Sequence, residues 1–233
     1  MGLGHSPRIV TDGLVLCLDA ANSRSYPKTG TTWTDLKGGN NGTLTNMDAA
    51  NFSSASGGSL SFDGANESVN FGNDSLTPSL PFSISCWAMF LNTDVCRLFA
   101  SSNGTNTYYG FWFQKTWSDY LEISYGDGTG ASSNDRRSKV SSDTPSTDIW
   151  CHLTAVVRGA GDMDIYINAE DAGGSYSGSG GNINYGTGYY PSIAKFKNYY
   201  DGSCKISGFM VYDKALTADE VRQNYLATKE RYA

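Results

Sequence analysis

The chain has 233 residues, of which 39% are hydrophobic and 17% are charged, and its formal net charge at pH 7 is -6. This length fits one all-β domain, since such domains often run to about 200–250 residues as single units, and it can bury a sizeable core. No cluster of lysine and arginine exceeds the pair Arg136–Arg137 and no apolar run reaches membrane-spanning length, so neither nucleic acid nor a membrane is an expected partner.

The order of apolar and turn residues predicts about a dozen short strands in one domain, residues 10–233, after an N-terminal arm at residues 1–9. Apolar and polar residues alternate with a period of two, which places every second side chain on one face of a strand. The loop after the first strand holds Trp33, which we expect to be buried. The predicted strands lie at 13–20, 43–45, 58–64, 69–71, 82–90, 97–101, 108–114, 120–125, 150–158, 162–168, 192–196 and 204–212.

Turn-rich segments separate these strands. The dipeptide Asp63–Gly64 favours a tight turn, so the strands on either side of it are expected to form a hairpin. Residues 126–148 are polar and are expected to hold at most one short edge strand. Residues 171–188 are so rich in glycine and serine that only a loop is expected there.

Three residues of the clearest strands carry specific expectations. Trp87, in the strand 82–90, and Trp150, at the start of the strand 150–158, are predicted to be buried core residues. His152 follows Trp150 and is expected to be half exposed.

One helix is predicted near 218–227. Thr217 and Glu220 have the spacing of a capping box, in which each side chain satisfies a free backbone N–H of the other residue. Val221, Tyr225 and Leu226 give the segment a narrow apolar stripe. Many short strands and one terminal helix indicate an all-β fold of two packed antiparallel sheets.

The five cysteines are odd in number and irregularly spaced, without a CxxC motif. Cys17 and Cys86 lie within apolar strand patterns, where a free cysteine behaves as a small core residue. Buried free thiols are therefore expected rather than a disulfide framework. A single pair such as Cys86–Cys96, meeting across a hairpin, is the alternative.

Catalytic motifs are not found in the sequence. Glycoside hydrolysis requires two carboxylates, about 5–5.5 or 6.5–9.5 Å apart, but no glutamate begins the E-x-D-x-x-E pattern of related glucanases. Asp162 and Asp164 alternate correctly, yet they lie at a hairpin entry and are expected to face solvent. His5 and His152 lie far apart in the chain, outside the common zinc motifs. No catalytic residue is proposed, and the chain is expected not to be an enzyme.

Asp63, Asn66 and Asp201 are the candidate ligands of one structural calcium ion, because Ca²⁺ prefers carboxylate and carbonyl oxygens. The alternative is that Asp63–Gly64 and Asp201–Gly202 are simple turns. No cofactor is expected to be required.

Aromatic residues crowd the predicted loops and strand ends. Such rings fill cores, anchor protein interfaces, or stack on the apolar faces of sugars, and all three roles stay open here. The candidate ligand-binding residues are Tyr108, Tyr109, Trp112, Trp117, Tyr189 and Tyr190.

Four segments in this order resemble motifs of laminin-G-like domains, and the resemblance covers about residues 10–227. It implies a jelly-roll sandwich of the concanavalin A type. Asn168 is retained from the family pattern, whereas Ala169 replaces a usual glycine, and Ser207 and Gly208 replace an acidic pair. The four segments are 58–72 (GSLSFDGANESVNFG), 82–90 (FSISCWAMF), 150–170 (WCHLTAVVRGAGDMDIYINAE) and 205–221 (KISGFMVYDKALTADEV).

Residues 9–46 and 221–232 are similar to virion proteins of tailed phages of aquatic bacteria, in which a laminin-G-like jelly roll decorates a capsid or forms part of a tail fibre. This similarity implies a non-enzymatic virion structural protein. Its partners would be other virion proteins, further copies of itself in a homo-oligomer, and host-surface glycans. The opening segment lacks the apolar core of a secretory signal, which agrees with synthesis in a host cytoplasm and location in a virion. A secreted carbohydrate-binding module and a glycoside hydrolase are the alternatives.

Overall fold

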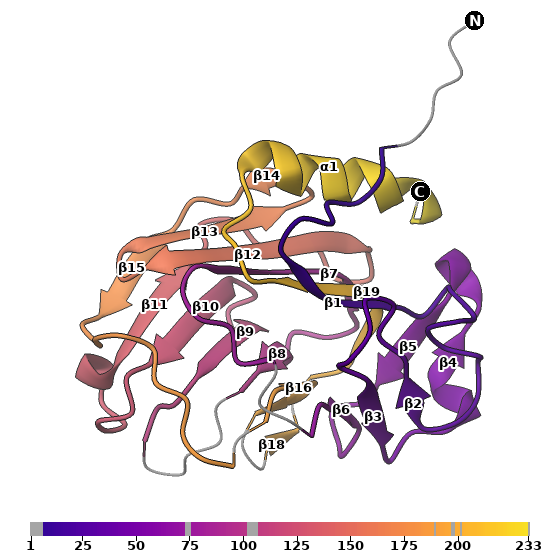
Figure 1. Cartoon of the computed structure of the whole chain (residues 1–233), viewed down its shortest axis with the longest axis horizontal. Coiled ribbons are helices and arrows are strands. Elements are labelled where there is room, and N and C mark those ends of the chain that lie inside the picture. Colours follow the sequence, from indigo (N-terminus) through magenta and orange to yellow (C-terminus); the bar gives the residue numbers. More distant parts are fainter. Residues whose placement is uncertain are drawn as a thin grey trace, which may run out of the picture.

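The computed structural model describes residues 7–72, 76–101, 107–188, 190–196, 199–200 and 202–232. Within these ranges the chain forms two antiparallel sheets that pack face to face, with one α-helix on the outer side of the first sheet (Figure 1). The predicted two-sheet sandwich with a C-terminal helix is therefore confirmed. Over the same ranges, no helix is both long enough and apolar enough to cross a membrane.

The first sheet has eight strands among the described residues, in the order β14-β13-β12-β7-β19-β5-β4, and β1 also pairs with β19. Its centre consists of three nine-residue strands, β7 (Phe82–Phe90), β12 (Cys151–Gly159) and β19 (Cys204–Tyr212). The other strands are β1 (Leu14–Asp19), β4 (Phe52–Ser53), β5 (Ser59–Phe62), β13 (Asp162–Ile167) and β14 (Glu170–Asp171).

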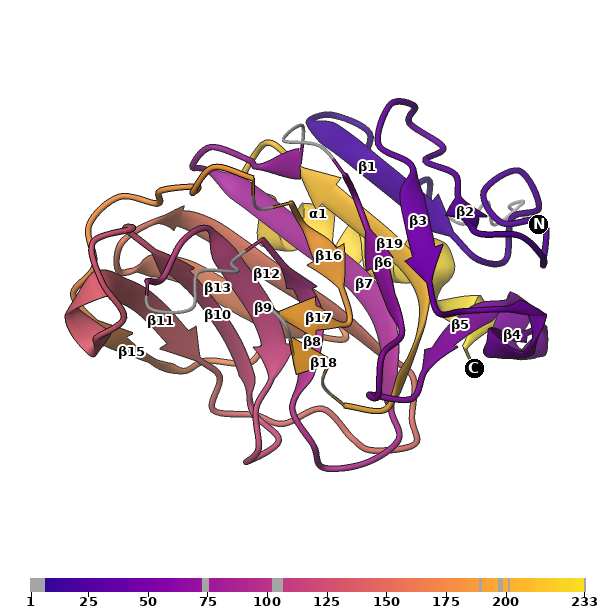
Figure 2. The same ribbon diagram turned by 90° about the horizontal axis from the view of Figure 1, so that it is seen from below.

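The second sheet has nine described strands, in the order β15-β11-β10-β9-β8-β16-β6-β3-β2, and it faces the viewer in Figure 2. A two-stranded ribbon of β17 (Lys195–Phe196) and β18 (Tyr199–Tyr200) lies beside it. The nine strands are β2 (Thr32–Trp33), β3 (Gly42–Thr45), β6 (Ser68–Asn70), β8 (Cys96–Ala100), β9 (Phe111–Lys115), β10 (Leu121–Gly126), β11 (Arg136–Val140), β15 (Ser175–Gly178) and β16 (Ser192–Ile193).

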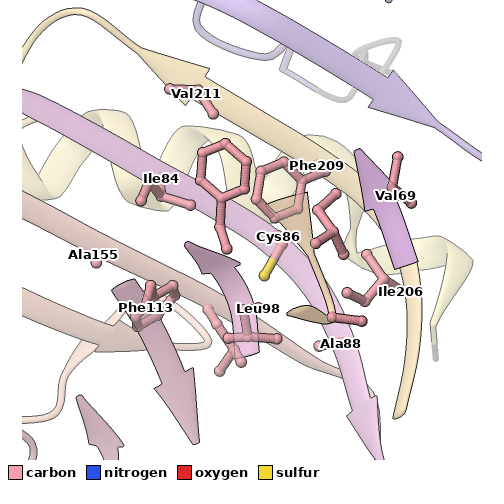
Figure 3. Packing of buried hydrophobic residues seen from close by; sticks show 14 of the residues in the cluster. Val69, Ile84, Cys86, Ala88, Leu98, Phe113, Ala155, Ile206, Phe209 and Val211 are labelled. Carbon is pink, nitrogen blue, oxygen red and sulfur yellow. The ribbon is translucent and has the colours of Figure 1, made fainter. Parts of the chain in front are cut away.

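The core lies between the two sheets and is built by the period-two alternation. In β7, Ile84 and Cys86 point inward with Phe209 and Val211 of β19, and they meet residues of the other sheet such as Phe113 (Figure 3). Contact across the sandwich is direct, since the rings of Phe99 and Phe209 are 5.0 Å apart. Trp33 is completely buried in the same core, as predicted.

Helix α1 (Ala218–Thr228) begins with the predicted capping box. The Thr217 Oγ1 accepts a hydrogen bond from the Glu220 N–H, and Glu220 Oε2 accepts one from the Thr217 N–H. The buried face of the helix differs from the predicted stripe, because Val221 and Asn224 are buried whereas Tyr225 is only partly covered. The burial of Asn224 is tolerated because both ends of its amide are hydrogen-bonded: Nδ2 donates to the Tyr212 hydroxyl and Oδ1 accepts from the backbone N–H of Val10.

Three predicted elements are wrong. The strands around Asp63–Gly64 do not form a hairpin, because β5 belongs to the eight-stranded sheet and β6 to the nine-stranded sheet. The segment predicted as loop at 171–188 contains β15. Strand β11 consequently lies inside the sheet, between β10 and β15, and not at its edge. The sequence gives no apolar signal for β15 because three of its four residues are exposed.

Two of the residue-level expectations for the strand at 150–158 are also wrong. His152 is completely buried, because α1 covers the outer face of the sheet at this point and the rings of Tyr225 and Trp87 lie against the imidazole. Trp150, by contrast, is only partly buried, since it precedes β12 and lies at the rim of the helix contact beside Tyr232. Trp87 is 3% exposed, as predicted.

The strands at the ends of the two strand orders are short. Among the described residues, β14, β4 and β2 have two residues each and β15 has four. The six-residue β1, which among the described strands pairs only with β19, is a further edge, and its open side is hydrogen-bonded to Asp35, Leu36 and Asn40. The long strands β7, β12 and β19 lie in the interior of their sheet.

Candidate functional site

The outer face of the nine-stranded sheet carries polar side chains where β9 and β10 alternate. In β9, Phe111 and Phe113 point into the core, so Trp112 and Gln114 point outward. In β10, Leu121 and Ile123 point inward, which turns Glu122 and Ser124 outward. The register then places Glu122 opposite Gln114 and Ser124 opposite Trp112.

A cavity of about 180 Å³ opens on this outer face, and we call it the outer-face cup. It combines three aromatic rings with two arginines, one amide and one carboxylate. The lining residues are Arg97, Tyr108, Trp112, Gln114, Glu122, Arg136 and Phe196.

The aromatic side of the outer-face cup is a continuous stack. The ring of Trp112 lies 5.4 Å from that of Tyr108 and 5.5 Å from that of Phe196. Each arginine covers one flanking ring: the Arg97 guanidinium lies 5.0 Å from the Phe196 centroid and the Arg136 guanidinium 5.4 Å from that of Tyr108. Cation–π contact of this kind holds a guanidinium in place, and Arg136 Nη1 also donates a hydrogen bond to the Tyr108 hydroxyl at 3.3 Å.

The polar side of the cup is centred on Glu122. Its carboxylate accepts hydrogen bonds of 2.6 Å from Gln114 Nε2 and from the Ser124 hydroxyl. Ser124 in turn lies 2.6 Å from the Ser138 hydroxyl on β11. Gln114 Oε1 and Arg136 Nε are buried and have no hydrogen-bond partner among the described residues. Buried polar atoms without a partner are uncommon in folded proteins, so these two atoms indicate a place for a polar ligand group.

This arrangement suits a small polyhydroxylated molecule. An aromatic wall contacts the apolar face of a sugar ring, while amide, carboxylate and guanidinium groups bind hydroxyls. The volume is below the roughly 300–1,000 Å³ of pockets for drug-sized ligands, so the cup is suited to one sugar residue and not to a long buried chain.

Two other cavities lie around the helix, on the opposite side of the molecule. One, of about 390 Å³, is mainly apolar and lies between α1, β19 and residues 7–11. The other, of about 260 Å³, lies at the helix C-terminus between Trp87, Trp150, Tyr225 and Tyr232.

The structure brings together only two of the aromatic candidates from the sequence, Tyr108 and Trp112. Tyr109 does not line the cup. Trp117 is 71% exposed in the turn after β9, and Tyr190 is 46% exposed. Tyr189 lies outside the described residues.

Sequence reasoning missed the charged and amide members of the cup. Arg97, Gln114, Glu122 and Arg136 come from four different strands, and Phe196 from the ribbon beside them. The alternation of β9 and β10 could have indicated two of them. Once the core residues of these strands are assigned, Gln114 and Glu122 fall on the same outward face as Trp112 and Ser124.

Two of the three calcium candidates, Asp63 and Asn66, lie within the described residues. The Asp63 carboxylate accepts a hydrogen bond of 2.7 Å from the Ala65 N–H, which is the geometry of a turn, and the backbone carbonyl of Asn66 accepts one from Asn46. Asp201 lies outside the described residues. Among those that are described, no group of three His, Cys, Asp or Glu residues could hold a metal. The calcium ion stays a prediction.

The carboxylates considered for catalysis are ion-paired. Arg158 donates to Asp162 at 3.1 Å and to Asp164 at 2.7 Å. Asp162 is 62% exposed, as expected for a residue facing solvent, whereas the side chain of Asp164 is 25% exposed. Both lie on β13, in the other sheet from the outer-face cup.

The two-sheet antiparallel sandwich is a lectin-like jelly-roll fold. The chain belongs to the concanavalin A-like lectin/glucanases superfamily, because the profile of its Laminin_G_3 family matches residues 63–222. The resemblance to laminin-G-like domains is thus confirmed. A comparison with curated protein sequences returns no match.

Solved structures with the same fold come from larger proteins. A Trypanosoma rangeli sialidase is similar with a TM-score of 0.62 at 12% identity, over 96% of this chain and 34% of the sialidase. The same enzyme in complex with sialic acid has a TM-score of 0.60 at 13% identity, again over 96% of this chain and 34% of the sialidase. The binding domain of botulinum neurotoxin serotype G has a TM-score of 0.59 at 13% identity, over 91% of this chain and 50% of the neurotoxin domain. The chain therefore spans about a third of the sialidases and half of the neurotoxin domain.

These comparisons correct the expectation that the chain is not an enzyme. The fold occurs in sialidases as well as in a toxin binding domain, so the missing glucanase pattern does not exclude catalysis. At identities of 12–15% the likeness shows the fold alone.

Proposed function

We propose that the chain is a carbohydrate-binding domain and that the outer-face cup is its ligand site. The observation that carries the proposal is that an aromatic stack and the Gln114–Glu122 pair line the same cavity on the outer face of the nine-stranded sheet. Trp112 is 4% exposed and Gln114 is 8% exposed, so these polar and aromatic groups are already held in position. Groups fixed in advance lose little conformational entropy when a ligand binds.

A binding experiment with one variant and one matched control tests this proposal. The purified chain is titrated against a panel of bacterial and algal oligosaccharides by calorimetry. Glu122→Gln keeps the shape of the cup but removes a charged acceptor, so it should weaken binding roughly tenfold, since charge-assisted hydrogen bonds are about twice as strong as neutral ones. Glu170→Gln, an exposed position on β14 of the other sheet, should bind normally.

The same mixtures are assayed for new reducing ends, so that binding and turnover are measured separately. Equal affinities for Glu122→Gln, Glu170→Gln and the unmodified chain would contradict the assignment of the cup. A panel in which no oligosaccharide binds at millimolar concentration would contradict the function itself.

We further propose that this domain is carried on the virion of a tailed phage, as a capsid decoration or tail-associated protein in several copies. The similarity of residues 9–46 and 221–232 to such virion proteins supports this proposal. The geometry is compatible with it: Gln223 Nε2 donates to the Arg8 carbonyl at 2.7 Å, so the N-terminal residues and α1 lie together, away from the outer-face cup. Attachment through this side would leave the cup free, and many copies would strengthen a weak glycan contact.

Mass spectrometry of purified virions tests the location. Hundreds of copies per particle would assign the protein to the capsid, and a handful would assign it to the tail. Its absence from particles that are otherwise complete would contradict the virion proposal but not the binding of glycans.

A further inference from the structure

Two cysteines from opposite sheets are in direct contact in the core. Cys96 begins β8 in the nine-stranded sheet and Cys204 begins β19 in the eight-stranded sheet. Their Sγ atoms are 2.9 Å apart, although 108 residues separate them in the chain. This separation is less than one ångström longer than a disulfide bond, which measures about 2.05 Å.

The backbone holds this contact in place. Cys204 is paired on both sides, with Phe62 of β5 and Phe90 of β7, and Cys96 is paired with Lys115 of β9. The backbone just before β19 lies against that of β8: Gly202 has a φ of +72°, and a Cβ there would collide with the carbonyl oxygen of Val95. A glycine is therefore required for the close approach of the two strands.

A hydrogen bond, and not burial, distinguishes this pair from the other cysteines. Cys204 and Cys96 are 0% and 1% exposed, but Cys86 is also fully buried in the core (Figure 3). Among the described residues, the one hydrogen bond between two sulfur atoms joins Cys96 and Cys204. The hydrogen bond with Cys96, together with burial, raises the pKa of the Cys204 thiol well above its usual value. In the folded, reduced protein Cys204 would therefore hold little thiolate and react slowly, so a bond between the two cysteines would form while the sheets assemble.

We propose that Cys96 and Cys204 form a disulfide that links the two sheets when the chain folds in the presence of a low-molecular-weight disulfide such as oxidised glutathione. One cysteine thiolate attacks the small disulfide and releases one small thiol. The second cysteine thiolate then displaces the other small thiol from the mixed disulfide. One S–S bond forms in the protein, and the two electrons and two protons from its thiols end on two molecules of reduced glutathione.

Alkylation of the whole chain provides the first test. The protein is refolded with oxidised glutathione, unfolded in guanidinium chloride without reductant and treated with iodoacetamide. Three of the five cysteines should be alkylated, and all five should react after reduction. Peptide mapping should find one crosslink, between the peptides of Cys96 and Cys204. Five alkylated cysteines, or a crosslink between any other pair, would overturn the proposal.

Variants and melting temperatures provide the second test. Cys86→Ala removes a neighbouring core cysteine and should keep the crosslink, whereas Cys96→Ala and Cys204→Ala should lose it. Closing a long loop should raise the melting temperature of the oxidised protein by roughly 10 °C over the reduced protein. The melting temperature of Cys96→Ala should not respond to reductant. If the crosslink forms in the unmodified protein but reductant does not change its melting temperature, the stabilising role of the disulfide would be overturned.

Discussion

His152 is a titratable side chain enclosed on all sides by the sheet and the helix. It is 0% exposed, and its Nε2 lies 3.0 Å from the Ser85 hydroxyl. Its Nδ1 has no hydrogen-bond partner among the residues that the structure describes. Burial disfavours the charged imidazolium and lowers the pKa of His152 from 6.5 to about 3. The folded protein therefore contains this histidine in its neutral form.

This low pKa predicts a specific loss of stability in acid. A base whose pKa is lower in the folded chain binds fewer protons there than in the unfolded chain, so its contribution is complete above pH 6.5 and decreases as the pH falls towards about 3. The loss should approach about 1.4 kcal/mol per pH unit. Urea unfolding between pH 7 and pH 4 should show a shallower decline for His152→Gln than for the unmodified chain. Parallel curves would contradict the prediction.

The two tryptophans beside the helix should differ in their contribution to stability. Trp87 is stacked on Tyr232 with ring centroids 4.0 Å apart, and its Nε1 donates to Thr228. We expect Trp87→Ala to cost about 3–5 kcal/mol, as for other buried aromatic residues. Trp150→Ala should cost only about 1 kcal/mol because Trp150 is partly exposed. Equal losses in guanidinium chloride unfolding would contradict the difference in burial.

At the scale of elements, the helix depends on its first turn because it has a short buried face. Val221 and Asn224 are the buried residues of α1, so packing alone gives the helix few contacts. Lys214 adds a hydrogen bond of 2.7 Å to Glu220, the acidic member of the capping box. Residues before and within the first turn therefore link α1 to the end of β19.

Removal of the cap should weaken the docking of the helix. We expect Thr217→Ala to destabilise the chain by about 1 kcal/mol, the usual effect of losing an N-cap side chain. Arg222→Ala, at an exposed position in the same helix, is the control and should change stability by less than about 0.5 kcal/mol. Thermal unfolding of both variants measures the difference, and an equal response would contradict the role of the cap.

The strands that the sequence predicted most closely are the long apolar ones. Strands β7, β12 and β19 have nine residues each, most of them buried, and their positions were predicted to within a residue or two. Strand β15 could not be predicted because it is held by backbone pairing with β11 and buries almost no side chain. The assignment of β5 and β6 to different sheets could not be predicted from the sequence either, because local alternation indicates the inward face of a strand but not the strands that it pairs with.

At the scale of the whole molecule, the sandwich separates two surfaces. The helix and residues 7–11 cover the outer face of the eight-stranded sheet, which lies behind the nine-stranded sheet in Figure 2. The outer-face cup lies on the nine-stranded sheet. The cup itself could be predicted only in part. Trp112 and Tyr108 were recognisable as aromatic candidates, but Arg97 and Arg136 line the same cavity only because β8, β9, β10 and β11 lie side by side. Contacts between distant parts of the chain are not visible in a local pattern.

This separation predicts the footprint of a bound glycan. Hydrogen exchange measured with and without a saturating oligosaccharide should slow several-fold in β9, β10 and β11, which carry the cup. Exchange in α1 should not change, because no residue of that helix lines the cup. Protection confined to α1 would instead place the ligand in one of the cavities beside the helix.

The short outer strands limit how copies of this chain can associate. A long, open edge strand offers unpaired N–H and C=O groups to any other chain, and this is a common route to aggregation and to continuous intermolecular sheets. Here the edges β14, β4 and β2 have two residues each and β15 has four. The open side of the longer edge strand β1 is hydrogen-bonded to Asp35, Leu36 and Asn40, so little free backbone is left to hold a second chain. Ordered association would therefore use side chains on the faces and loops, and protein crowded at high local concentration should resist growth into fibrils.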